Sequence, residues 1–372
     1  MKIVIEAWSA RVGGGQTYLR NLLASFPEGK GLDVHVYAPA SLELPQHPGV
    51  TRRTTRWPVT NPLLRVFWQL FVLPLILWRE KADVLFCPGG LVLTPAPPGC
   101  RVVTMFRNML PFDAELARAS SQGVRGAKLQ LLRWLMLRSM RRADMTIFIS
   151  TYCRQLIERL IPLRQAVTIY HGIAEHFRTG NATPAPATLT AGRYLLYVSR
   201  FDIYKHHLEL VEAFARLPEA MRSEYPLVLV GEDDSVSAAR VRARIAELGV
   251  EAQVIIAGAV PYAQLPGWYA HAALNLFLSS CENCPNILLE AMAAGRPIVC
   301  SSVAPMPEFA GDAAMLVDPR VPAQIADAIQ AVLADDGLAQ QLADRAAQRS
   351  RDFSWATSAA QTWDVLAGMH QE

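Results

Sequence analysis

Short runs of apolar residues alternate with amphipathic stretches along the whole chain. Runs that are apolar almost throughout indicate strands covered on both faces, as in parallel sheets packed between helices. Two successive sets of them predict an α/β chain made of two doubly wound domains. The runs are KIVIEAW, LDVHVYAP, ADVLFCP, RVVTMF, ADMTIFIS and AVTIYHG, then RYLLYVSR, PLVLVGE, QVIIAG, LNLFLS, PIVCSS and AAMLVD.

The two sets of runs are separated by a stretch that reads GNATPAPATLTAG. It is rich in Pro, Ala, Thr and Gly, which argues against a helix or a central strand. We therefore predict an N-terminal domain over residues 1–172, a linker over 173–192 and a C-terminal domain over 193–352. The end of the chain, residues 353–372, carries one more amphipathic helix pattern, FSWATSAAQTWDVLAGM.

Composition supports this organisation and suggests where the protein resides. The 372 residues are 51% hydrophobic with a net charge of +3, which fits about two folded domains and excludes a disordered chain. The six cysteines are scattered, and the N-terminus leads straight into a strand pattern, so we expect a reduced, cytoplasmic protein. The most apolar stretch, residues 63–78, is interrupted by Arg65, Gln69 and Pro74 and is shorter than the ~20 residues of a spanning helix.

Two motifs follow predicted strands and open predicted helices. GGGQTYLRNLL, residues 13–23, offers glycines for close backbone approach and a helix start with unpaired N–H groups. It is neither a P-loop nor a dinucleotide fingerprint, and a plain tight turn is an equal alternative. In YVSRFDIYKHH, Arg200 ends a strand and Lys205 begins a helix. Strand ends and helix starts of an open α/β sheet meet at one rim, where ligands bind. Two cations there favour a diphosphate ligand, although solvated surface charges are the alternative.

A third motif, SSCENCPNILLEAMAAG at residues 279–295, combines a helix start with two acids. Pro285 suits the first helical position and Gly295 the left-handed residue after the helix. Cys284 belongs to a CxxC pair, but the chain offers it no second ligand pair, and an acid beside the first thiol disfavours a thiolate. Metal and redox roles are therefore disfavoured.

The two acids of this motif, Glu282 and Glu290, have several interpretations. An acid/base pair cannot be tested from sequence spacing, because the relevant separation is a distance in space. Carboxylates also accept hydrogen bonds from hydroxyl groups. A ligand with phosphates in the middle and hydroxylated rings on both sides would need central cations and peripheral carboxylates. That ligand is a nucleotide sugar.

These segments together resemble a known family. Residues 279–308 resemble the Glu-x7-Glu signature of the retaining glycosyltransferases of the GT-B fold, family 4. Residues 199–214 are similar to the Arg/Lys diphosphate-binding segment of that family, and residues 258–280 to its nucleotide-binding loop. The resemblance implies two Rossmann-like domains that face each other across a cleft, with the terminal helix crossing back to the N-terminal domain. It is specific in the C-terminal half and loose between about residues 30 and 165.

The resemblance also implies roles for individual residues. Arg200 and Lys205 would neutralise the diphosphate and assist departure of the leaving group, while Glu282 would accept from hydroxyls of the transferred sugar. The implied donor-binding residues are Gly14, Gly15, Gly258, Val260, Glu290 at the ribose, and the backbone N–H groups of Asn286, Ile287 and Leu288. The family acts without a metal or cofactor and retains the anomeric configuration.

One segment departs from the family pattern. Where many members carry a His-Asp pair, FRNMLPFD has Arg107 and Asn108, and neither is a general base at neutral pH. Both remain candidates for contacts with a sugar or acceptor. His171, in YHGIAEHF, is a weak substitute, because packing near the domain boundary explains it better.

The acceptor is expected on the N-terminal domain, where basic and aromatic residues concentrate. VRGAKLQLLRWLMLRSMRR, residues 124–142, has a basic amphipathic pattern that suits an anionic membrane surface, although its apolar side could simply pack on the sheet. A lipid-linked oligosaccharide or another glycan would fit as acceptor, and a place on the inner face of the cell membrane is a hypothesis. Nucleic acid is not expected as a partner.

The leading hypothesis is therefore a hexosyltransferase of surface polysaccharide or lipopolysaccharide assembly, with GDP- or UDP-hexose favoured as donor. A GT-B-like epimerase or phosphorylase is the enzymatic alternative, although no cofactor-lysine signature of a phosphorylase is present. A non-catalytic nucleotide-sugar-binding protein is the alternative from a different class. The sequence does not name the base, the sugar, the acceptor or the linkage.

Overall fold

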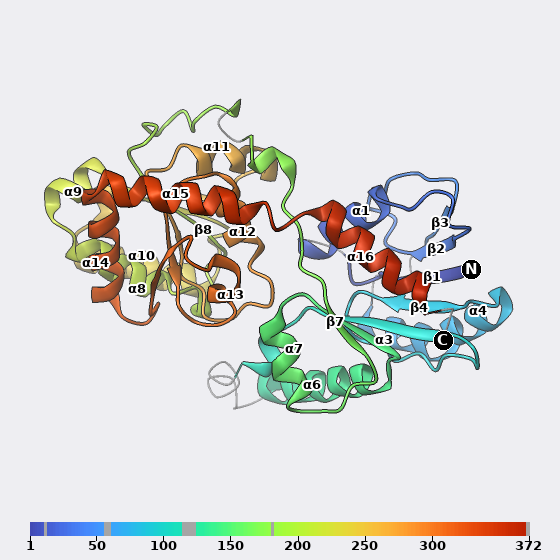
Figure 1. Cartoon of the computed structure of the whole chain (residues 1–372). Helices are drawn as coiled ribbons and strands as arrows, with labels where there is room; N and C mark the ends of the chain where they lie inside the picture. The colour runs from blue at the N-terminus through green and yellow to red at the C-terminus, as the bar shows by residue number, and fades with distance from the viewer. Residues whose placement is uncertain (11–12, 56–60, 114–123, 180–181, 370–372) are drawn as a thin grey trace. The chain divides into compact units, whose positions relative to one another are not determined.

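The computed structural model describes residues 1–10, 13–55, 61–113, 124–179 and 182–369. The chain divides into two compact units, and each is a parallel sheet flanked by helices (Figure 1). The first unit comprises Met1–Gly172 together with Ser354–Glu372, and the second comprises Ile173–Phe353.

The sheet of the first unit has seven strands in the order β3-β2-β1-β4-β5-β6-β7, and all neighbours pair in parallel. The order reverses between β1 and β4, so the loops that follow these two strands diverge at one rim. The strands are β1 Lys2–Glu6, β2 Asp33–Tyr37, β3 Val50–Arg53, β4 Val84–Cys87, β5 Arg101–Phe106, β6 Met145–Phe148 and β7 Ala166–Thr168.

Helices cover both faces of this sheet. On one face α1 (Gly14–Ala24) packs against α16 (Trp355–Gly368), where the Trp363 indole N–H donates to the Leu22 carbonyl at 2.9 Å (Figure 1). The helices of the other face are α3 Pro62–Phe67, the π-helical turn η1 Trp68–Val72, α4 Leu73–Glu80, α6 Val124–Arg142 and α7 Thr151–Glu158, with the 3-10 turn η2 Leu110–Phe112 beside them.

The sheet of the second unit is also wholly parallel, in the order β10-β9-β8-β11-β12-β13, and it reverses between β8 and β11. Its four inner strands, β8, β9, β11 and β12, are largely apolar on both sides and buried, as expected for a sheet between two helix layers, whereas the edge strands β10 and β13 are partly exposed. The strands are β8 Leu195–Val198, β9 Leu227–Val230, β10 Val254–Gly258, β11 Leu274–Phe277, β12 Ile298–Ser301 and β13 Met315–Val317.

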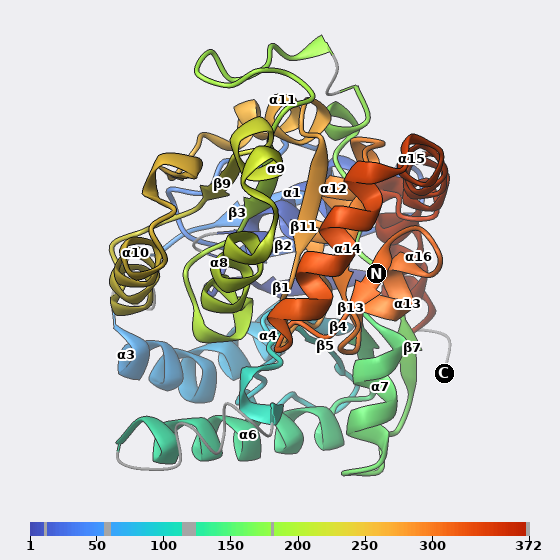
Figure 2. The same ribbon diagram turned by 90° about the vertical axis from the view of Figure 1, so that its left-hand side faces the viewer.

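The helices of the second unit form two layers. Figure 2 shows α8 and α14 in front of the sheet with α10 beside them, and these helices share one apolar core with the strands. The helices are α8 His207–Arg216, α9 Glu219–Glu224, α10 Val236–Leu248, α11 Leu265–Ala270, α12 Asn286–Ala293, α13 Met306–Ala310, α14 Pro322–Ala334 and α15 Asp336–Ser350, and the 3-10 turns are η3 Glu175–Phe177, η5 Ile203–Lys205, η6 Glu251–Gln253 and η7 Tyr262–Gln264.

Two features differ from the sequence predictions. Strand β3 was missed, because VTRR is a short edge strand with its two arginines exposed and lacks the apolar run of a buried strand. Residues 173–192, expected as a separate linker, belong to the second unit, apart from residues 180–181, which lie outside the description. Phe177 lies 5.3 Å from the Tyr262 ring, and the Thr183 carbonyl lies 3.0 Å from Nε2 of His271.

Candidate functional site

The reversal point of the second sheet brings two loops together. The loop after β8 and the loop after β11 leave the carboxyl ends of neighbouring strands, which is where open α/β sheets bind ligands. The Ser280 N–H donates to the Tyr204 carbonyl at 2.8 Å, and the Tyr197 hydroxyl donates to the Lys205 carbonyl at 2.6 Å. These two hydrogen bonds tie the loop after β8 to its own strand and to the loop after β11.

Lys205 and Glu282 form an ion pair at this point. The Lys205 ammonium donates to Glu282 Oε1, and the exposed fractions of the two side chains are only 8% and 16%. The ammonium also lies 5.3 Å from the Tyr204 ring centre and 5.5 Å from that of Phe277. A charge-assisted pair so shielded from water interacts strongly. The sequence named both residues, but it did not predict that they contact each other.

His206 is a residue of this site that the sequence analysis missed. Its backbone adopts a left-handed conformation with φ 53°, which is uncommon outside glycine. Its Nε2 lies 2.8 Å from Ser280 Oγ, and its Nδ1 lies 3.2 Å from Glu209 Oε1. His206 thus ties the loop of Lys205 to the loop of Glu282. The sequence offers no signal for this conformation, because it depends on which loop lies opposite.

Arg200 lies apart from the buried ion pair. Its side chain is 73% exposed, and its Nε lies 3.3 Å from Oε2 of Glu232, which follows β9. A guanidinium at the rim with only an exposed acid beside it can turn toward an anionic ligand at little cost. The structure therefore places the two predicted cations differently, with Lys205 shielded and Arg200 accessible.

Helix α12 begins one residue later than predicted. Pro285 is the residue before the helix, with φ −81° and ψ 73°, and Asn286 is the first helical residue. The Asn286 N–H donates to the Cys284 carbonyl at 2.9 Å, so it is already engaged in this structure. Ile287 and Leu288 follow in the first turn, where a helix provides no acceptor for its own N–H groups. Gly295 ends the helix with φ 62°, as predicted.

Glu290 lies further along α12, beside the loop that follows β10. The Tyr262 hydroxyl donates to Glu290 Oε1 at 3.0 Å. Burial raises the pKa of Glu290 to about 7, and the hydrogen bond from Tyr262 opposes that shift. Gly258 ends β10 with φ 68°, and Val260 stands two residues before Tyr262, so the predicted base-binding segment leads directly to the partner of Glu290.

The two cysteines of the CxxC are free thiols. Cys281 is buried, and the Cys284 Sγ lies 3.5 Å from Asn286 Oδ1, close to the start of α12. Within the described part of the chain, no group of three or more His, Cys, Asp and Glu side chains is arranged to hold a metal ion.

The reversal point of the first sheet forms a pocket of about 200 Å³. It brings together two residues that the sequence named separately, Gly15 of α1 and Arg107 after β5. A Cβ atom on Gly15 would lie 3.4 Å from Ala10 Cα and 3.8 Å from Arg107 Nη1, so the glycine leaves room between them. Gly14, the first residue of α1, is not among the residues that line the pocket, which are Ala7, Ser9, Ala10, Gly15, Leu19, Pro88, Gly89 and Arg107.

The Tyr18 ring supports Arg107, and Tyr18 in turn packs against His171 and Trp355. The Arg107 guanidinium lies 5.4 Å from the Tyr18 ring centre. The buried His171 ring lies 5.5 Å from Tyr18 and 5.1 Å from Trp355, so it packs between α1 and α16 and does not line the pocket. Asn108 accepts a hydrogen bond from the Leu110 N–H at 3.2 Å and shapes the turn before η2. Arg107 is thus the candidate of the three that lines the pocket.

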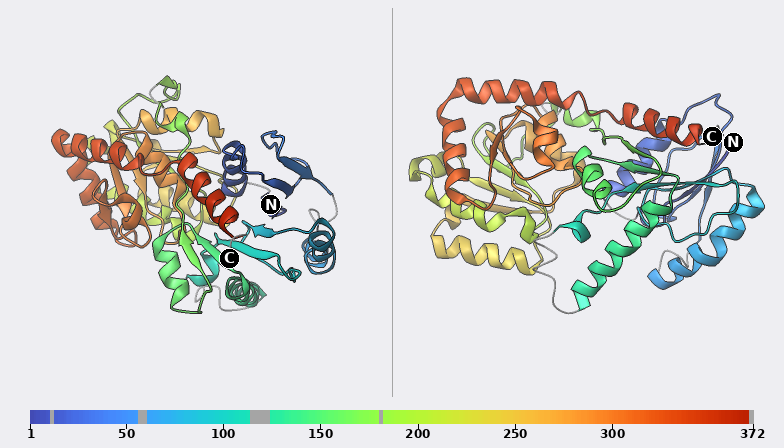
Figure 3. Two further views of the ribbon diagram at one scale, coloured as in Figure 1. Left: turned by 45° about the vertical axis from the view of Figure 1, so that its right-hand side comes forward. Right: turned by 60° about the horizontal axis from the view of Figure 1, so that its bottom comes forward.

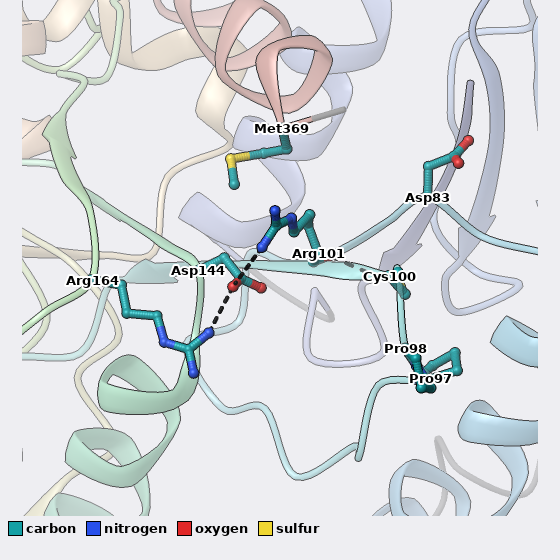
Figure 4. Close-up of a pocket in the computed structure, with 9 residues that line it drawn as sticks. Asp83, Pro97, Pro98, Cys100, Arg101, Asp144, Arg164 and Met369 are labelled. Carbon is teal, nitrogen blue, oxygen red and sulfur yellow. Dashed lines mark hydrogen bonds and ion pairs between the residues drawn. The ribbon is translucent and has the colours of Figure 1, made fainter. Parts of the chain in front are cut away.

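A larger pocket of about 500 Å³ lies at the opposite edge of the first sheet, where strands β4, β5 and β6 begin (Figure 4). Its acids already hold the sheet together, since Asp83 accepts from the Lys2 N–H at 2.6 Å and Asp144 from the Val102 N–H at 2.8 Å. Arg164 and Arg101 lie 2.8 and 3.6 Å from Asp144 Oδ1. These contacts hold the amino ends of the strands together, whereas ligands of such sheets bind at the carboxyl ends.

Comparisons with known proteins assign both halves of the chain to glycosyltransferases. Residues 12–177 match the profile of Glycosyltransferase Family 4, and residues 185–349 match the profile of Glycosyl transferases group 1. The chain is 34% identical over 174 residues to the O-antigen chain mannosyltransferase B of Escherichia coli, an alignment of 45% of this chain and 44% of that protein. It is 33% identical over 176 residues to the D-inositol 3-phosphate glycosyltransferase of Xylanimonas cellulosilytica, covering 46% and 42%. The matched region thus spans less than half of each relative.

Solved structures with the same fold cover nearly the whole chain. Sucrose-phosphate synthase from Thermosynechococcus elongatus has a TM-score of 0.75 at 19% identity and covers 98% of both chains. WaaG, a glycosyltransferase involved in lipopolysaccharide biosynthesis, has a TM-score of 0.72 at 17% identity, covering 99% of this chain and 100% of its own. HepE of Anabaena in complex with UDP and glucose has a TM-score of 0.70 at 17% identity, again covering 99% and 100%. These likenesses confirm the predicted fold of two Rossmann-like domains.

Proposed function

We propose that this chain, which belongs to the glycosyltransferases of the GT-B fold, transfers a hexose from a nucleotide-diphosphate sugar to a hydroxyl group of a glycan or lipid-linked glycan. The observation that carries the proposal is the Lys205–Glu282 pair at the reversal point of the second sheet. A cation and a carboxylate side by side suit a ligand whose phosphates and sugar hydroxyls are neighbours.

In the proposed reaction the cations act on the leaving group. As the bond between the sugar and the diphosphate breaks, negative charge develops on the phosphate oxygen. A shielded ammonium at Lys205 stabilises that charge more than a solvated one would, and Arg200 adds a second cation from the rim. The first turn of α12, with Ile287 and Leu288, presents backbone N–H groups to the same ligand.

The carboxylates act on the hydroxyl groups. Glu282 accepts from hydroxyls of the transferred sugar and Glu290 from those of the ribose, while Gly258 and Val260 line the place of the base. Transfer with retention of the anomeric configuration and without a metal remains part of the proposal, by resemblance to the family. The acceptor enters at Arg107, in a pocket whose small residues leave space for a sugar ring, while Gly14 and Gly15 keep the donor-binding role that the resemblance to the family implies.

The pathway is proposed from relatives. The O-antigen mannosyltransferase and WaaG both build surface glycans according to their names, which supports assembly of surface polysaccharide or lipopolysaccharide. The HepE structure holds UDP and glucose, which supports a UDP-hexose donor, while a GDP-hexose remains the other favoured donor. A cytoplasmic protein that works at the inner face of the membrane would meet both a nucleotide sugar and a lipid-linked acceptor.

A donor screen tests the proposal. Calorimetry with UDP-, GDP- and dTDP-hexoses should identify one nucleotide that binds, and that donor should release nucleoside diphosphate when glycan or lipid extract is added. Proton NMR of the purified product then reports the anomeric configuration, which we expect to be retained. Binding without turnover across all donors and extracts would support a nucleotide-sugar-binding protein instead. An inverted product would refute retention while leaving transfer intact.

A further inference from the structure

The helical run at residues 62–80 has two very different sides. Segments α3, η1 and α4 follow one another without a break, and by length and composition the run could cross a membrane. One side is committed to the protein, because Trp68, Leu73 and Leu77 are buried in a core with Val4, Trp8, Tyr37 and Leu85. The Trp68 ring, for example, lies 5.5 Å from the Trp8 ring.

The other side of the run exposes large apolar side chains in a row. They recur at intervals of three or four residues, which places them on one helix face. Contiguous apolar surface of this kind usually marks an interaction site. The exposed fractions are 77% for Leu63, 52% for Phe67, 58% for Phe71, 61% for Leu75 and 69% for Trp78.

The charges of the two helical runs on this side of the first unit are almost all positive. Residues 62–80 and 124–142 together contain eight Arg and Lys and one acid, Glu80. Glu80 is turned inward, with Oε2 lying 2.6 Å from His35 Nδ1 and Oε1 accepting from the Tyr37 hydroxyl at 3.4 Å. Both helical runs extend from the same face of the sheet (Figure 3, right). Of these cations Arg79, Lys128, Arg138, Arg141 and Arg142 are exposed, so exposed cations flank an exposed apolar row.

Helix α6 contributes charge more than apolar surface. Of the apolar residues between its cations, Met136 and Met140 are buried toward the sheet, while Leu131 and Trp134 are 57% and 56% exposed. The Arg138 guanidinium lies 5.5 Å from the Trp134 ring, so cation and ring are presented together. The sequence analysis assigned membrane contact to α6, whereas the structure exposes the larger apolar row on residues 62–80.

We propose that the exposed side of residues 62–80, flanked by α6, docks on the surface of an anionic lipid bilayer. An apolar row that enters the acyl boundary beside cations that meet anionic headgroups is the arrangement of an interfacial helix. The helix lies on the membrane and does not cross it, because crossing would remove Trp68, Leu73 and Leu77 from the core. This docking goes beyond the proposed transfer reaction and needs neither donor nor acceptor.

Charge argues against a second copy of this chain as the occupant. In a two-fold dimer the same patch meets itself, so the exposed cations Arg79, Lys128, Arg138, Arg141 and Arg142 would lie opposite an identical set. Like charges across such an interface repel, whereas anionic headgroups attract them. The bilayer is therefore the occupant that satisfies the apolar row and the cations at once.

Vesicle co-sedimentation of the full chain tests the docking. Wild-type protein should bind vesicles of phosphatidylcholine with phosphatidylglycerol about tenfold more strongly than vesicles of phosphatidylcholine alone. Rising salt should release the protein from the anionic vesicles, because salt screens the attraction between cations and headgroups. The triple variant F67S/F71S/L75S should lose about tenfold or more in partition at all salt concentrations. The variant K128S/R138S/R141S should lose its preference for anionic vesicles while keeping the apolar contribution.

A matched control uses exposed apolar residues of the second unit. Val236, Ile255 and Leu316 are 81%, 38% and 37% exposed, and V236S/I255S/L316S should bind vesicles like the wild type. Equal thermal melting of all variants would show that they fold. Unchanged vesicle binding by F67S/F71S/L75S would overturn the proposal. The proposal would also fail if bound wild-type protein resisted alkaline extraction, because that would indicate a spanning helix. It would fail as well if the wild type were a dimer and F67S/F71S/L75S converted it to a monomer, because the second copy would then be the occupant.

Discussion

The two sheets reverse strand order in the same way, yet their reversal points are built differently. In the second unit the point between β8 and β11 is occupied by the Lys205–Glu282 pair. In the first unit the point between β1 and β4 is a pocket of about 200 Å³, and among the described residues that line it the charged one is Arg107. The fold therefore determines where a ligand binds, and the side chains determine which ligand. Fixed charges suit a diphosphate, whereas open space suits a neutral acceptor.

The largest expected effect comes from removing the shielded cation. Lys205→Met should lower kcat/KM by about 10²–10³-fold, because charge on the departing diphosphate loses its closest stabiliser. Steady-state rates with the identified donor and acceptor measure this loss. Lys205→Arg keeps the charge and should lose much less than Lys205→Met.

Stability must be separated from catalysis in this variant. Lys205→Met leaves Glu282 shielded and unpaired, which should cost roughly 3–5 kcal/mol of unfolding free energy. Adding Glu282→Gln removes the unpaired charge, so the double variant should regain most of the stability while its turnover stays low. A double variant with wild-type turnover would contradict the role of the pair in catalysis.

The next prediction tests whether the two reversal points bind different ligands, the acceptor in the first unit and the nucleotide in the second. Arg107→Ala should raise the KM of the acceptor by about 10–100-fold and leave nucleotide affinity unchanged, since a charged hydrogen bond contributes about 1.5–3 kcal/mol. Arg200→Ala should weaken nucleoside diphosphate about tenfold and leave acceptor KM unchanged. Calorimetry measures the affinity for the nucleotide, and the dependence of the rate on acceptor concentration gives the acceptor KM. If both variants affect the same ligand, the division of roles between the sheets is wrong.

Most strands of both sheets could be predicted from the sequence, because a strand buried on both faces has an almost continuous run of apolar residues. The prediction failed where tertiary contacts decide. Strand β3 is an exposed edge, and the turn before α12 places Pro285 outside the helix. The Lys205–Glu282 contact joins residues 77 positions apart, and it depends on β8 lying beside β11. No local pattern encodes that neighbourhood.

Individual side-chain environments were equally hard to predict. The sequence analysis named Arg107 because it departs from a family pattern. The structure shows that Arg107 lines a pocket together with Gly15. Asn108 and His171 were named for the same reason, yet one shapes a turn and the other packs in the core. The raised pKa of Glu290 follows from burial that the sequence does not show. The functional roles of these residues stay predictions.

A smaller effect concerns pH and belongs to the second unit alone. The pKa of Glu290 is about 7, raised by burial, so its carboxyl group is partly protonated near neutral pH. Ribose hydroxyls donate to the charged form, so donor affinity should rise by up to about tenfold between pH 6 and pH 8. Binding should release protons, which calorimetry in buffers of different ionisation enthalpy detects.

Two variants give the matching controls for the pH effect. Glu290→Gln should flatten the pH dependence and bind donor with the weaker affinity seen at low pH. Arg107→Ala in the first unit should keep the wild-type pH dependence of donor affinity. A pH dependence that survives in Glu290→Gln would assign the titration to another group.

The smallest effect should come from His206, which positions one loop against another. Replacing His206 with glycine removes the left-handed strain of about 1–2 kcal/mol and also the contacts with Ser280 and Glu209, together worth about 1–2 kcal/mol, so stability in urea should change little. Turnover should fall by only about threefold, because two other hydrogen bonds still hold the loop. The Tyr197 hydroxyl donates to the Lys205 carbonyl, and the Ser280 N–H donates to the Tyr204 carbonyl. His206→Ala keeps the strain and loses the contacts, so it should be less stable than His206→Gly at similar turnover. If His206→Gly were as inactive as Lys205→Met, His206 would have to contact the ligand itself, and the charged centre of the second unit would be larger than one pair.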